Sequence, residues 1–191
     1  MSRTCCELKT NNSYFKIAQK TLCTHPNQDE TPCMNKIKQN QVEWVEQKSP
    51  RGKYHLFRRF LSVALGGKRD LGTWGGGHPF ELELTRIPPG KANFPYHAHA
   101  VQWELYVVLS GQGQTRTPEG KSEIGPGDCF LCPPGEPHQI QNSGTEDLVY
   151  YVIADNPQAE ITTYPDSGKW SIKPQRKSFE MTEVDYFKGE E

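Results

Sequence analysis

Residues 94–111 read FPYHAHAVQWELYVVLSG, and this stretch decides the fold. It places His97 and His99 one residue apart, with Glu104 five positions later, inside a run of strand-forming residues. Residues two apart on a β-strand point to the same face, so the two imidazoles project into one space and can meet one ion. Glu104 returns to that space if the chain bends near Val101–Gln102 and Glu104 opens an adjacent antiparallel strand.

The sequence around this stretch predicts an all-β domain. Seventeen glycines and 15 prolines lie along the chain beside short runs of Val, Ile, Tyr, Phe and Trp. This composition favours short strands joined by tight turns, as in a sandwich or jelly roll. The strand candidates are FELELTRI, FPYHAHA, WELYVVLS, GQTRT, KSEIG, DCFLCP, HQIQN and DLVYYVIAD.

FELELTRI, residues 80–87, is the clearest of these strands. Its alternate residues form two sets, Phe80, Leu82 and Leu84 against Glu81, Glu83 and Thr85. A period of two predicts one dry face and one wet face. Upstream, YHLFRRFLSVAL is expected to be a strand that runs into a helical turn.

A fourth ligand is expected from GDCFLCPPGEPHQIQN. On its strand, His138, Ile140 and Asn142 share one face, so His138 can enter the same interior as the first two histidines. The CxxC of Cys129 and Cys132 is interpreted as structural, because thiols three apart on a strand face opposite sides.

The two stretches resemble the two motifs of the cupin superfamily. The first motif has a glycine, a His-x-His pair, a glutamate and a closing glycine, and the second reads G-x5-P-x-G-x2-H-x3-N. The matching residues are Gly90, His97, His99, Glu104 and Gly111, then Gly127, Pro133, Gly135, His138 and Asn142. The resemblance covers residues 88–142 and implies a double-stranded β-helix, the jelly-roll β-barrel of cupins, with short helical segments at the ends.

One spacing departs from the first motif. Six residues separate Gly90 from His97 where the motif has five, so the loop before the ligands is longer. The motif therefore does not determine the shape of the cavity mouth. Fifteen residues separate Gly111 from Gly127. This short separation resembles compact, single-domain microbial cupins.

The resemblance implies that His97, His99, Glu104 and His138 hold one divalent transition metal ion per chain, either Mn, Fe, Ni, Co, Cu or Zn. Three imidazoles and one carboxylate leave open positions on an octahedral ion, where water, substrate or dioxygen can bind. Tyr106 shares the face of Glu104 on a regular strand. It is the candidate catalytic residue, and the alternative is an aromatic that fills the barrel.

Three functions fit these features. The first is a metal-dependent enzyme on a small oxygen-rich substrate, of dioxygenase, decarboxylase or isomerase type. The second is a non-catalytic, metal-dependent binding or sensor module for sugars or organic acids, and the third is a storage or structural role. No acid/base pair beyond the ligands is evident, which leaves the first two open.

The chain is expected to divide into three parts. Residues 1–40 are rich in Asn, Gln, Lys, Thr and Cys and are expected to be a disordered or loosely attached extension. Residues 41–175 are expected to form the barrel, and residues 176–191 a tail or short helix capped by Thr182.

Composition also bounds the partners. Residues 1–60 hold eleven Lys and Arg against five Asp and Glu, but without the clustered cations and aromatics of a nucleic-acid groove. No run of 18 apolar residues and no apolar leader is present, and the six cysteines are expected to be free thiols. We therefore expect a cytoplasmic protein that binds a small molecule, neither nucleic acid nor membrane, and that pairs as a homodimer through its sheet edges.

Overall fold

The structure is a computed structural model that describes residues 35–191. The expectations for most of the N-terminal extension, including Cys5, Cys6, Cys23 and Cys33, lie outside these residues. The division of the chain at residues 40 and 175 stays a prediction.

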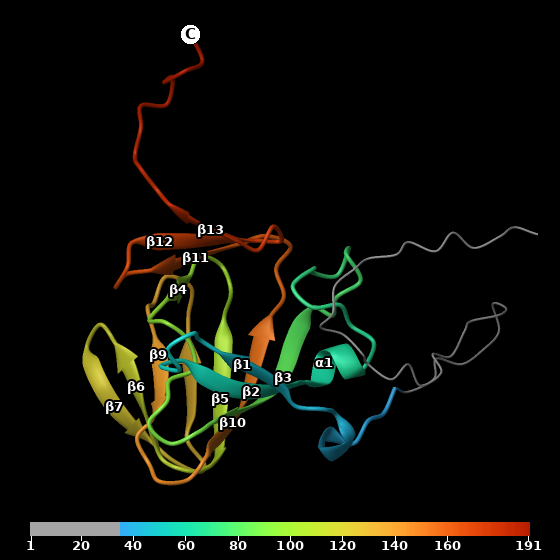
Figure 1. Cartoon of the computed structure of the whole chain (residues 1–191). Coiled ribbons are helices and arrows are strands. Elements are labelled where there is room, and N and C mark those ends of the chain that lie inside the picture. Colours follow the sequence, from blue (N-terminus) through green and yellow to red (C-terminus); the bar gives the residue numbers. More distant parts are fainter. Residues whose placement is uncertain (1–34) are drawn as a thin grey trace, which may run out of the picture. The chain divides into compact units, whose positions relative to one another are not determined.

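Strands are the main regular secondary structure of the described chain, with two short helices near its beginning (Figure 1). In chain order the elements are η1 (Gln39–Gln41), β1 (Val45–Lys48), β2 (His55–Phe60), α1 (Leu61–Ala64), β3 (Phe80–Ile87), β4 (Ala98–His99), β5 (Glu104–Ser110), β6 (Gly113–Thr117), β7 (Gly120–Ile124), β8 (Cys129–Cys132), β9 (Gln139–Asn142), β10 (Leu148–Asp155), β11 (Glu160–Tyr164), β12 (Lys169–Lys173) and β13 (Lys177–Glu180).

The strands form two layers of antiparallel sheet. One layer is the six-stranded sheet β1-β2-β3-β10-β5-β8. The other consists of the three-stranded sheet β7-β6-β9 and the four-stranded sheet β13-β12-β11-β4, joined by an antiparallel bridge between His97 and His138. This arrangement is an all-β double-stranded β-helix, as the sequence predicted.

The chain crosses between the layers at the bend that was expected near Val101–Gln102. The accompanying expectation, that the strands on either side of the bend are neighbours, is wrong. β4 pairs with β11, whereas β5 pairs with β10 and β8. His99 and Glu104 therefore face each other from opposite layers, because the bend carries the chain across the barrel.

One end of the barrel is filled by apolar side chains. The aliphatic part of this core is Leu56, Ile87, Val108, Ile124, Ile140 and Leu148, and Tyr106, Cys132 and Tyr150 complete it. Each of these residues is at an inward-pointing position of its strand. The two-residue alternation predicted from the sequence therefore places the side chains that form this core.

β3 keeps its alternation, but its charged side points into the barrel. Glu83 and Thr85 are buried, and both line the same internal cavity as Glu81. The end of the strand that carries Phe80 is the more exposed part, with that ring 46% accessible. The wet face that the sequence predicted is therefore the inside of a polar cavity.

The C-terminal part differs from the expected tail or short helix. Residues 177–180 form β13, which pairs with β12 and extends the four-stranded sheet. Residues 181–191 contain turns and no helix. The helical segments of the described chain thus lie only toward its N-terminal side.

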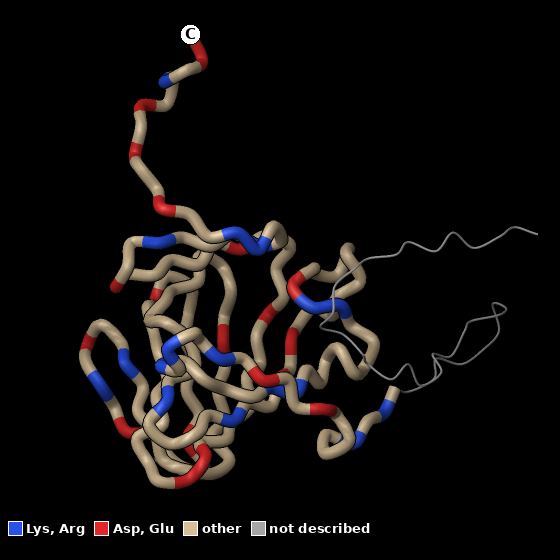
Figure 2. The backbone as a smooth tube through the Cα atoms, viewed as in Figure 1, with Lys and Arg blue, Asp and Glu red and all other residues tan. Residues whose placement is uncertain are grey.

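Charge is interspersed over residues 35–191. Figure 2 shows basic and acidic residues alternating along the strands and turns, without a long stripe of one sign. Within the described residues, no helix has the length and apolar character needed to cross a bilayer. The expected absence of a nucleic-acid partner stays a prediction.

Candidate metal centre

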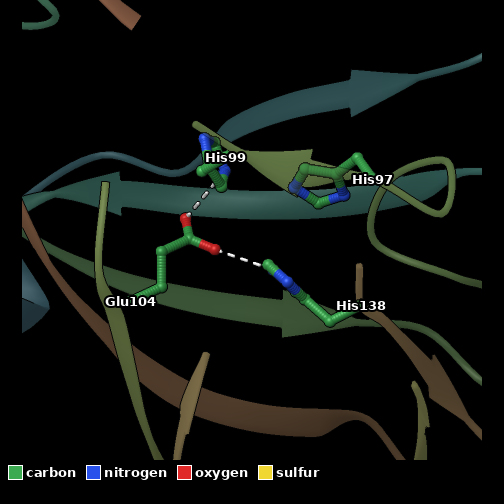
Figure 3. Close-up of side chains that lie close together, drawn as sticks. All are labelled: His97, His99, Glu104 and His138. Carbon is green, nitrogen blue, oxygen red and sulfur yellow. Dashed lines mark hydrogen bonds and ion pairs between the residues drawn. The ribbon is translucent and has the colours of Figure 1, made fainter. Parts of the chain in front are cut away.

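Four side chains converge where the two layers of the barrel meet. His97 and His138 precede β4 and β9 and exchange two backbone hydrogen bonds, with N···O distances of 3.1 and 2.8 Å. His99 ends β4, and Glu104 begins β5. One donor atom from each residue lies within 4.8 Å of the donor atoms of the other three (Figure 3).

Glu104 lies between two of the histidines, as Figure 3 shows. One carboxylate oxygen, Oε2, is 2.9 Å from His138 Nε2, and the other, Oε1, is 3.7 Å from His99 Nε2. The His97 ring centroid is 4.7 Å from that of His138 and 5.0 Å from that of His99. All four side chains are at most slightly exposed, so they form one buried donor cluster.

Backbone carbonyls orient two of the rings. His97 Nδ1 donates to the Pro95 carbonyl at 2.8 Å, and His138 Nδ1 donates to the Glu136 carbonyl at 3.1 Å. A carbonyl can only accept, so both rings carry their proton on Nδ1 in the neutral form and keep a lone pair on Nε2. This is the arrangement that metal-bound histidines require.

The residues present fit a divalent transition ion. Three imidazoles and one carboxylate are a ligand set typical of such ions, and two of the rings already have their outer nitrogen hydrogen-bonded. Among residues 35–191, His99 Nδ1 is buried without a hydrogen-bond partner, and its nearest carboxylate oxygen is Glu160 Oε1 at 3.9 Å.

Glu160, the first residue of β11, holds the bend between the layers and was missed by the sequence analysis. It is 2% exposed, and its carboxylate accepts the backbone N–H groups of Ala100 at 2.6 Å and Gln102 at 2.9 Å, with Val101 at 3.3 Å. These bonds fix the segment that connects His99 to Glu104. No local pattern signals this role, because Glu160 lies about sixty residues downstream.

Burial and mutual charge shift the pKa values of the cluster. Burial, followed by the charge of His138, lowers the pKa of His97 to about 3. Burial also lowers the pKa of His99, although Glu104 opposes it. For Glu104, burial alone would raise the pKa, but the hydrogen bond to His138 and the charge of His99 outweigh it and hold the pKa far below its usual range. His97 and His99 therefore stay neutral beside an ionised carboxylate, as metal binding requires.

His138 differs from the other two histidines. Its burial alone would lower the pKa, but hydrogen bonds to Cys132 and Glu104 outweigh burial and raise the pKa to about 10. In the metal-free protein, His138 therefore carries a second proton on Nε2, which it shares with Glu104, and a bound metal ion would replace this proton.

Tyr106 contacts this cluster directly. Its hydroxyl donates to Glu104 Oε2 at 2.7 Å and lies 3.4 Å from His138 Nε2. The ring stacks on Phe130 with centroids 4.9 Å apart, which fixes the position of the hydroxyl. Burial, together with the charge of Glu104, raises the pKa of Tyr106 well above its usual value, so the hydroxyl stays a donor. A catalytic role for Tyr106 stays a prediction.

The other singled-out residues have structural positions. Cys132 is buried and Cys129 is exposed, as expected for residues three apart on a strand, and both thiols are free. The amide nitrogen of Asn142 donates to the carbonyls of Ile87 and Glu146, both at 2.7 Å. Asn142 therefore joins β9 to the end of β3 and to the loop before β10.

A cavity of about 400 Å³ opens beside the cluster. His97, His99, Glu104 and Tyr106 line one part of it, and aromatic side chains from the first motif and from the β11–β12 hairpin, Phe94 and Tyr164, line another. The sequence analysis missed the charged residues of the remaining wall, which come from distant segments of the chain. They are Arg58, Arg69, Asp70, Glu81, Glu83, Lys173 and Arg176.

A double-stranded β-helix that holds three histidines and one glutamate beside an internal cavity defines a class of metal-binding barrel proteins. A family model described as a cupin domain matches residues 83–154. The oxalate-binding protein of Thermotoga maritima is 31% identical over 68 residues, which is 36% of this chain and 55% of that protein. Auxin-binding protein 1 of Arabidopsis thaliana is 31% identical over 96 residues, 45% of this chain and 47% of that protein. The chain spans about half the length of the curated relatives it matches.

Solved structures share the fold over a longer part of the chain. A sugar phosphate isomerase of the cupin superfamily from Silicibacter pomeroyi has a TM-score of 0.62 at 22% identity, covering 75% of this chain and 90% of that one. A predicted oxalate decarboxylase from Thermotoga maritima has a TM-score of 0.52 at 21% identity, covering 63% and 98%. Residues 83–154 thus match a cupin domain, and the fold around them is shared with these structures.

Proposed function

We propose that this protein is a metal-dependent enzyme that acts on a small oxygen-rich substrate, of dioxygenase, decarboxylase or isomerase type. The observation that carries the proposal is the convergence of His97, His99, Glu104 and His138 within 4.8 Å, with the first three on the wall of a cavity of about 400 Å³. Cavities of this size fit small-molecule ligands.

The proposed ligands leave room for a substrate beside them. When bound, a divalent ion would supply Lewis-acid polarisation and a template for substrate oxygens. The protein's part is to hold the donors: the Pro95 and Glu136 carbonyls orient two rings, and the Tyr106 hydroxyl fixes one oxygen of Glu104. Tyr106 is therefore proposed as a positioning residue for the carboxylate ligand, with its catalytic role dependent on contact with substrate.

Two carboxyl groups in the cavity supply the acid/base candidates that the sequence did not offer. Glu81 and Glu83 point inward from β3 beside the cavity. Burial raises the pKa of Glu81, even though its carboxylate accepts the Asp70 backbone N–H at 2.8 Å. A carboxyl group with a raised pKa is suited to exchanging a proton with a bound substrate. We favour catalysis over simple binding for this reason.

A binding module is the second candidate. It is favoured by the similarity of 68 residues to a protein named for binding oxalate, whereas two structural neighbours are named as an isomerase and a decarboxylase. All three names concern small, oxygen-rich anions, so they support the same ligand class for either candidate. They differ in whether a product forms.

Product formation separates the two candidates. Untagged protein is reconstituted with Mn, Fe, Ni, Co, Cu or Zn in turn, and oxygen uptake and product formation are followed with dicarboxylates, phenols and sugar phosphates. Turnover that disappears in His138→Ala, with an unchanged fold by circular dichroism, supports the enzyme. Saturable binding without product for every metal and substrate supports the binding module.

We further propose that the protein acts in the cytoplasm as a homodimer. β8 is an edge of the six-stranded sheet, and apolar side chains next to it are exposed, with Leu131 at 51%, Trp103 at 48% and Leu109 at 41%. Covering such a patch and edge is favourable. A monomer mass by sedimentation equilibrium, at concentrations up to the millimolar range, contradicts the dimer.

A further inference from the structure

A second wall of the cavity carries four cationic side chains that the metal-centre account does not use. Arg58 points inward from β2, Arg69 lies in the loop before β3, and Lys173 and Arg176 lie at the β12–β13 turn. These segments are far apart in sequence, yet all four side chains line the cavity that contains the metal ligands.

Arg58 is almost completely buried, at 8% exposure. Its guanidinium nitrogen Nη1 donates to Glu83 Oε2 at 3.3 Å, and Nη2 donates to Gln47 Oε1 at 2.7 Å. The Nε–H is buried and has no hydrogen-bond partner among residues 35–191. A buried guanidinium with an unused donor costs stability, so its retention on a cavity wall points to a ligand that accepts this hydrogen bond.

Arg69 is held close to Arg58. Both guanidinium groups stack on the ring of Phe60, at 4.5 Å for Arg69 and 4.8 Å for Arg58, and their like charges oppose each other. The Nε of Arg69 is also buried and makes no hydrogen bond within the described chain, although it forms an ion pair with Asp70 Oδ2 at 3.5 Å. Both guanidinium groups therefore contact one aromatic ring and line the same cavity, and a guanidinium group is suited to binding a carboxylate or phosphate oxyanion.

Thr85 adds a third unused polar group at the same level of the barrel. It pairs with Arg58 across β2 and β3, is 1% exposed and lines the cavity. Its hydroxyl has no hydrogen-bond partner in the part of the chain that the structure describes. Buried polar groups almost always have hydrogen-bond partners. Three donors of the described chain without such partners on one cavity wall therefore indicate a ligand-binding site.

Asp70 occupies part of the cationic wall and indicates what the wall recognises. Lys173 Nζ lies 3.0 Å and Arg176 NH2 2.9 Å from its carboxylate, with Arg69 Nε at 3.5 Å. Among the described non-glycine residues, only Asp70 and Arg176 adopt a positive φ, 59° and 52°. The backbone therefore adopts an unfavourable conformation at Asp70, and this conformation places one carboxylate among three cations.

The charge balance of the lining leaves room for an anion once the metal is present. Four cationic side chains face Asp70, Glu81, Glu83 and Glu104, so the described lining is balanced before metal binding. A divalent ion adds two positive charges. A ligand with two negative charges restores neutrality in a site where unpaired charge is costly.

We propose that Arg58, Arg69 and Thr85 form an anion subsite for a carboxylate or phosphate group of the substrate, while other oxygens of the same molecule reach the metal. This inference rests on the proposed function only for the end of the substrate that would bind the metal. The ligand class is a small molecule with two negative charges in total, either a dicarboxylate or a phosphorylated hydroxy or keto compound.

The test uses the metal-free protein, so that anion binding is measured without the metal. Full-length protein is treated with chelator and dialysed, and binding of malonate and of inorganic phosphate is measured by calorimetry at low ionic strength. We expect saturable binding that Arg69→Gln weakens at least about ten-fold and Thr85→Val a few-fold. Arg51→Gln, an exposed residue outside the cavity with the same change of charge, should leave the affinity unchanged.

Further variants separate the subsite from the metal centre. His138→Ala should keep the anion affinity within about two-fold while losing metal, and Arg69→Gln should keep its metal content. Phosphate preferred over malonate indicates a phosphorylated substrate, and the reverse indicates a dicarboxylate. If neither anion binds, or if Arg69→Gln and Thr85→Val both bind like the parent protein, the subsite is wrong. Loss of metal binding with intact anion binding would instead contradict the proposed function alone.

Discussion

The two ends of the barrel are built from the same strands and differ in chemistry. Along β3, inward-facing residues change from Ile87 through Thr85 to Glu83 and Glu81, and along β5 they change from Val108 through Tyr106 to Glu104. β2, β9 and β10 follow the same gradient, from Leu56 to Arg58, from Ile140 back to His138, and from Leu148 to Tyr150.

Strand register aligns these changes at one level. Arg58, Thr85, Tyr150 and Val108 are successive partners across β2, β3, β10 and β5. Below this row the core is mainly aliphatic, and above it most of the interior is charged or hydrogen-bonded, with Val152 and Ala154 as aliphatic exceptions. Burial of apolar side chains at the dry end stabilises the barrel. Burial of the polar groups at the other end costs stability, so their presence there is explained by function.

The largest effect on stability is expected at the dry end. Leu148 is 0% exposed, so Leu148→Ala leaves a cavity and should lower the free energy of unfolding by about 2–5 kcal/mol. Denaturant titration measures this change. The control is Val184→Ala in the exposed C-terminal segment, which should stay within about 0.5 kcal/mol; equal effects of the two would mean that the barrel end is not a packed core.

At the polar end, the largest effect is expected on metal affinity. Glu104→Gln keeps the shape of the side chain but removes the anionic ligand, so the affinity for a divalent transition ion should fall at least about 10- to 100-fold. Competition with a chromophoric chelator measures the affinity. Glu123→Gln on the exposed strand β7 is the control, and unchanged affinity in Glu104→Gln would remove this residue from the ligand set.

The bend that joins the two layers should be the next most sensitive point. Glu160→Gln weakens the acceptor of the Ala100, Val101 and Gln102 N–H groups, so we expect a loss of about 1–3 kcal/mol in the metal-free protein. Faster amide exchange confined to residues 100–102 would identify the cause. Stability and exchange like those of the exposed control Glu180→Gln would contradict the role assigned to Glu160.

The cationic wall predicts a pH dependence of stability. Burial alone would raise the pKa of Asp70, but Lys173 and Arg69, with Arg176, outweigh it and lower the pKa. A lowered folded-state pKa contributes stability above the unfolded-state value of about 3.9, and this contribution is lost as pH falls through the folded-state pKa.

Asp70→Asn should therefore be less stable than the parent protein at pH 7, and the difference should shrink below about pH 4. Unfolding free energies of both proteins between pH 2 and pH 7 measure the difference, and the shared titration of Glu81 largely cancels in it. A difference that is constant over this range would mean that the Asp70 charge does not stabilise the wall.

The smallest effect is expected at the boundary between the two ends. Thr85→Val exchanges an unused buried hydroxyl for a methyl group, so the free energy of unfolding should change by less than about 1 kcal/mol, or rise. Thr115→Val is the matched control, because the Thr115 hydroxyl donates to the Ser122 carbonyl at 3.4 Å. If Thr85→Val is the more destabilising of the two, the Thr85 hydroxyl has a hydrogen-bond partner in solution.

The sequence predicted the parts of this architecture that depend on local period and spacing. The His-x-His pair, the position of His138 and the strands around them follow from a two-residue repeat and fixed turn positions. The same repeat does not say which face of a strand is inside, so Glu83 and Thr85 were assigned to a wet face that proved to be internal. Nor does it say whether a bend joins neighbours in one sheet or strands of opposite layers.

The rest of the cavity was not predictable because it is assembled from distant segments. Glu160, Lys173 and Arg176 lie 49 to 65 residues beyond Gly111, the last residue of the first motif, and Arg58 precedes the motif. Each is an ordinary charged residue in its local sequence. Only the pairing of β11 with β4 and of β2 with β3 brings them to the metal centre and the cavity wall.

The most direct test of the account is elemental analysis of untagged protein after metal reconstitution and removal of loosely bound ions. The account predicts one divalent transition ion per folded chain, lost in His97→Ala and His138→Ala, with X-ray absorption showing nitrogen and oxygen neighbours only. Protein that retains no ion, or retains the same amount when both histidines are replaced, would contradict the metal centre.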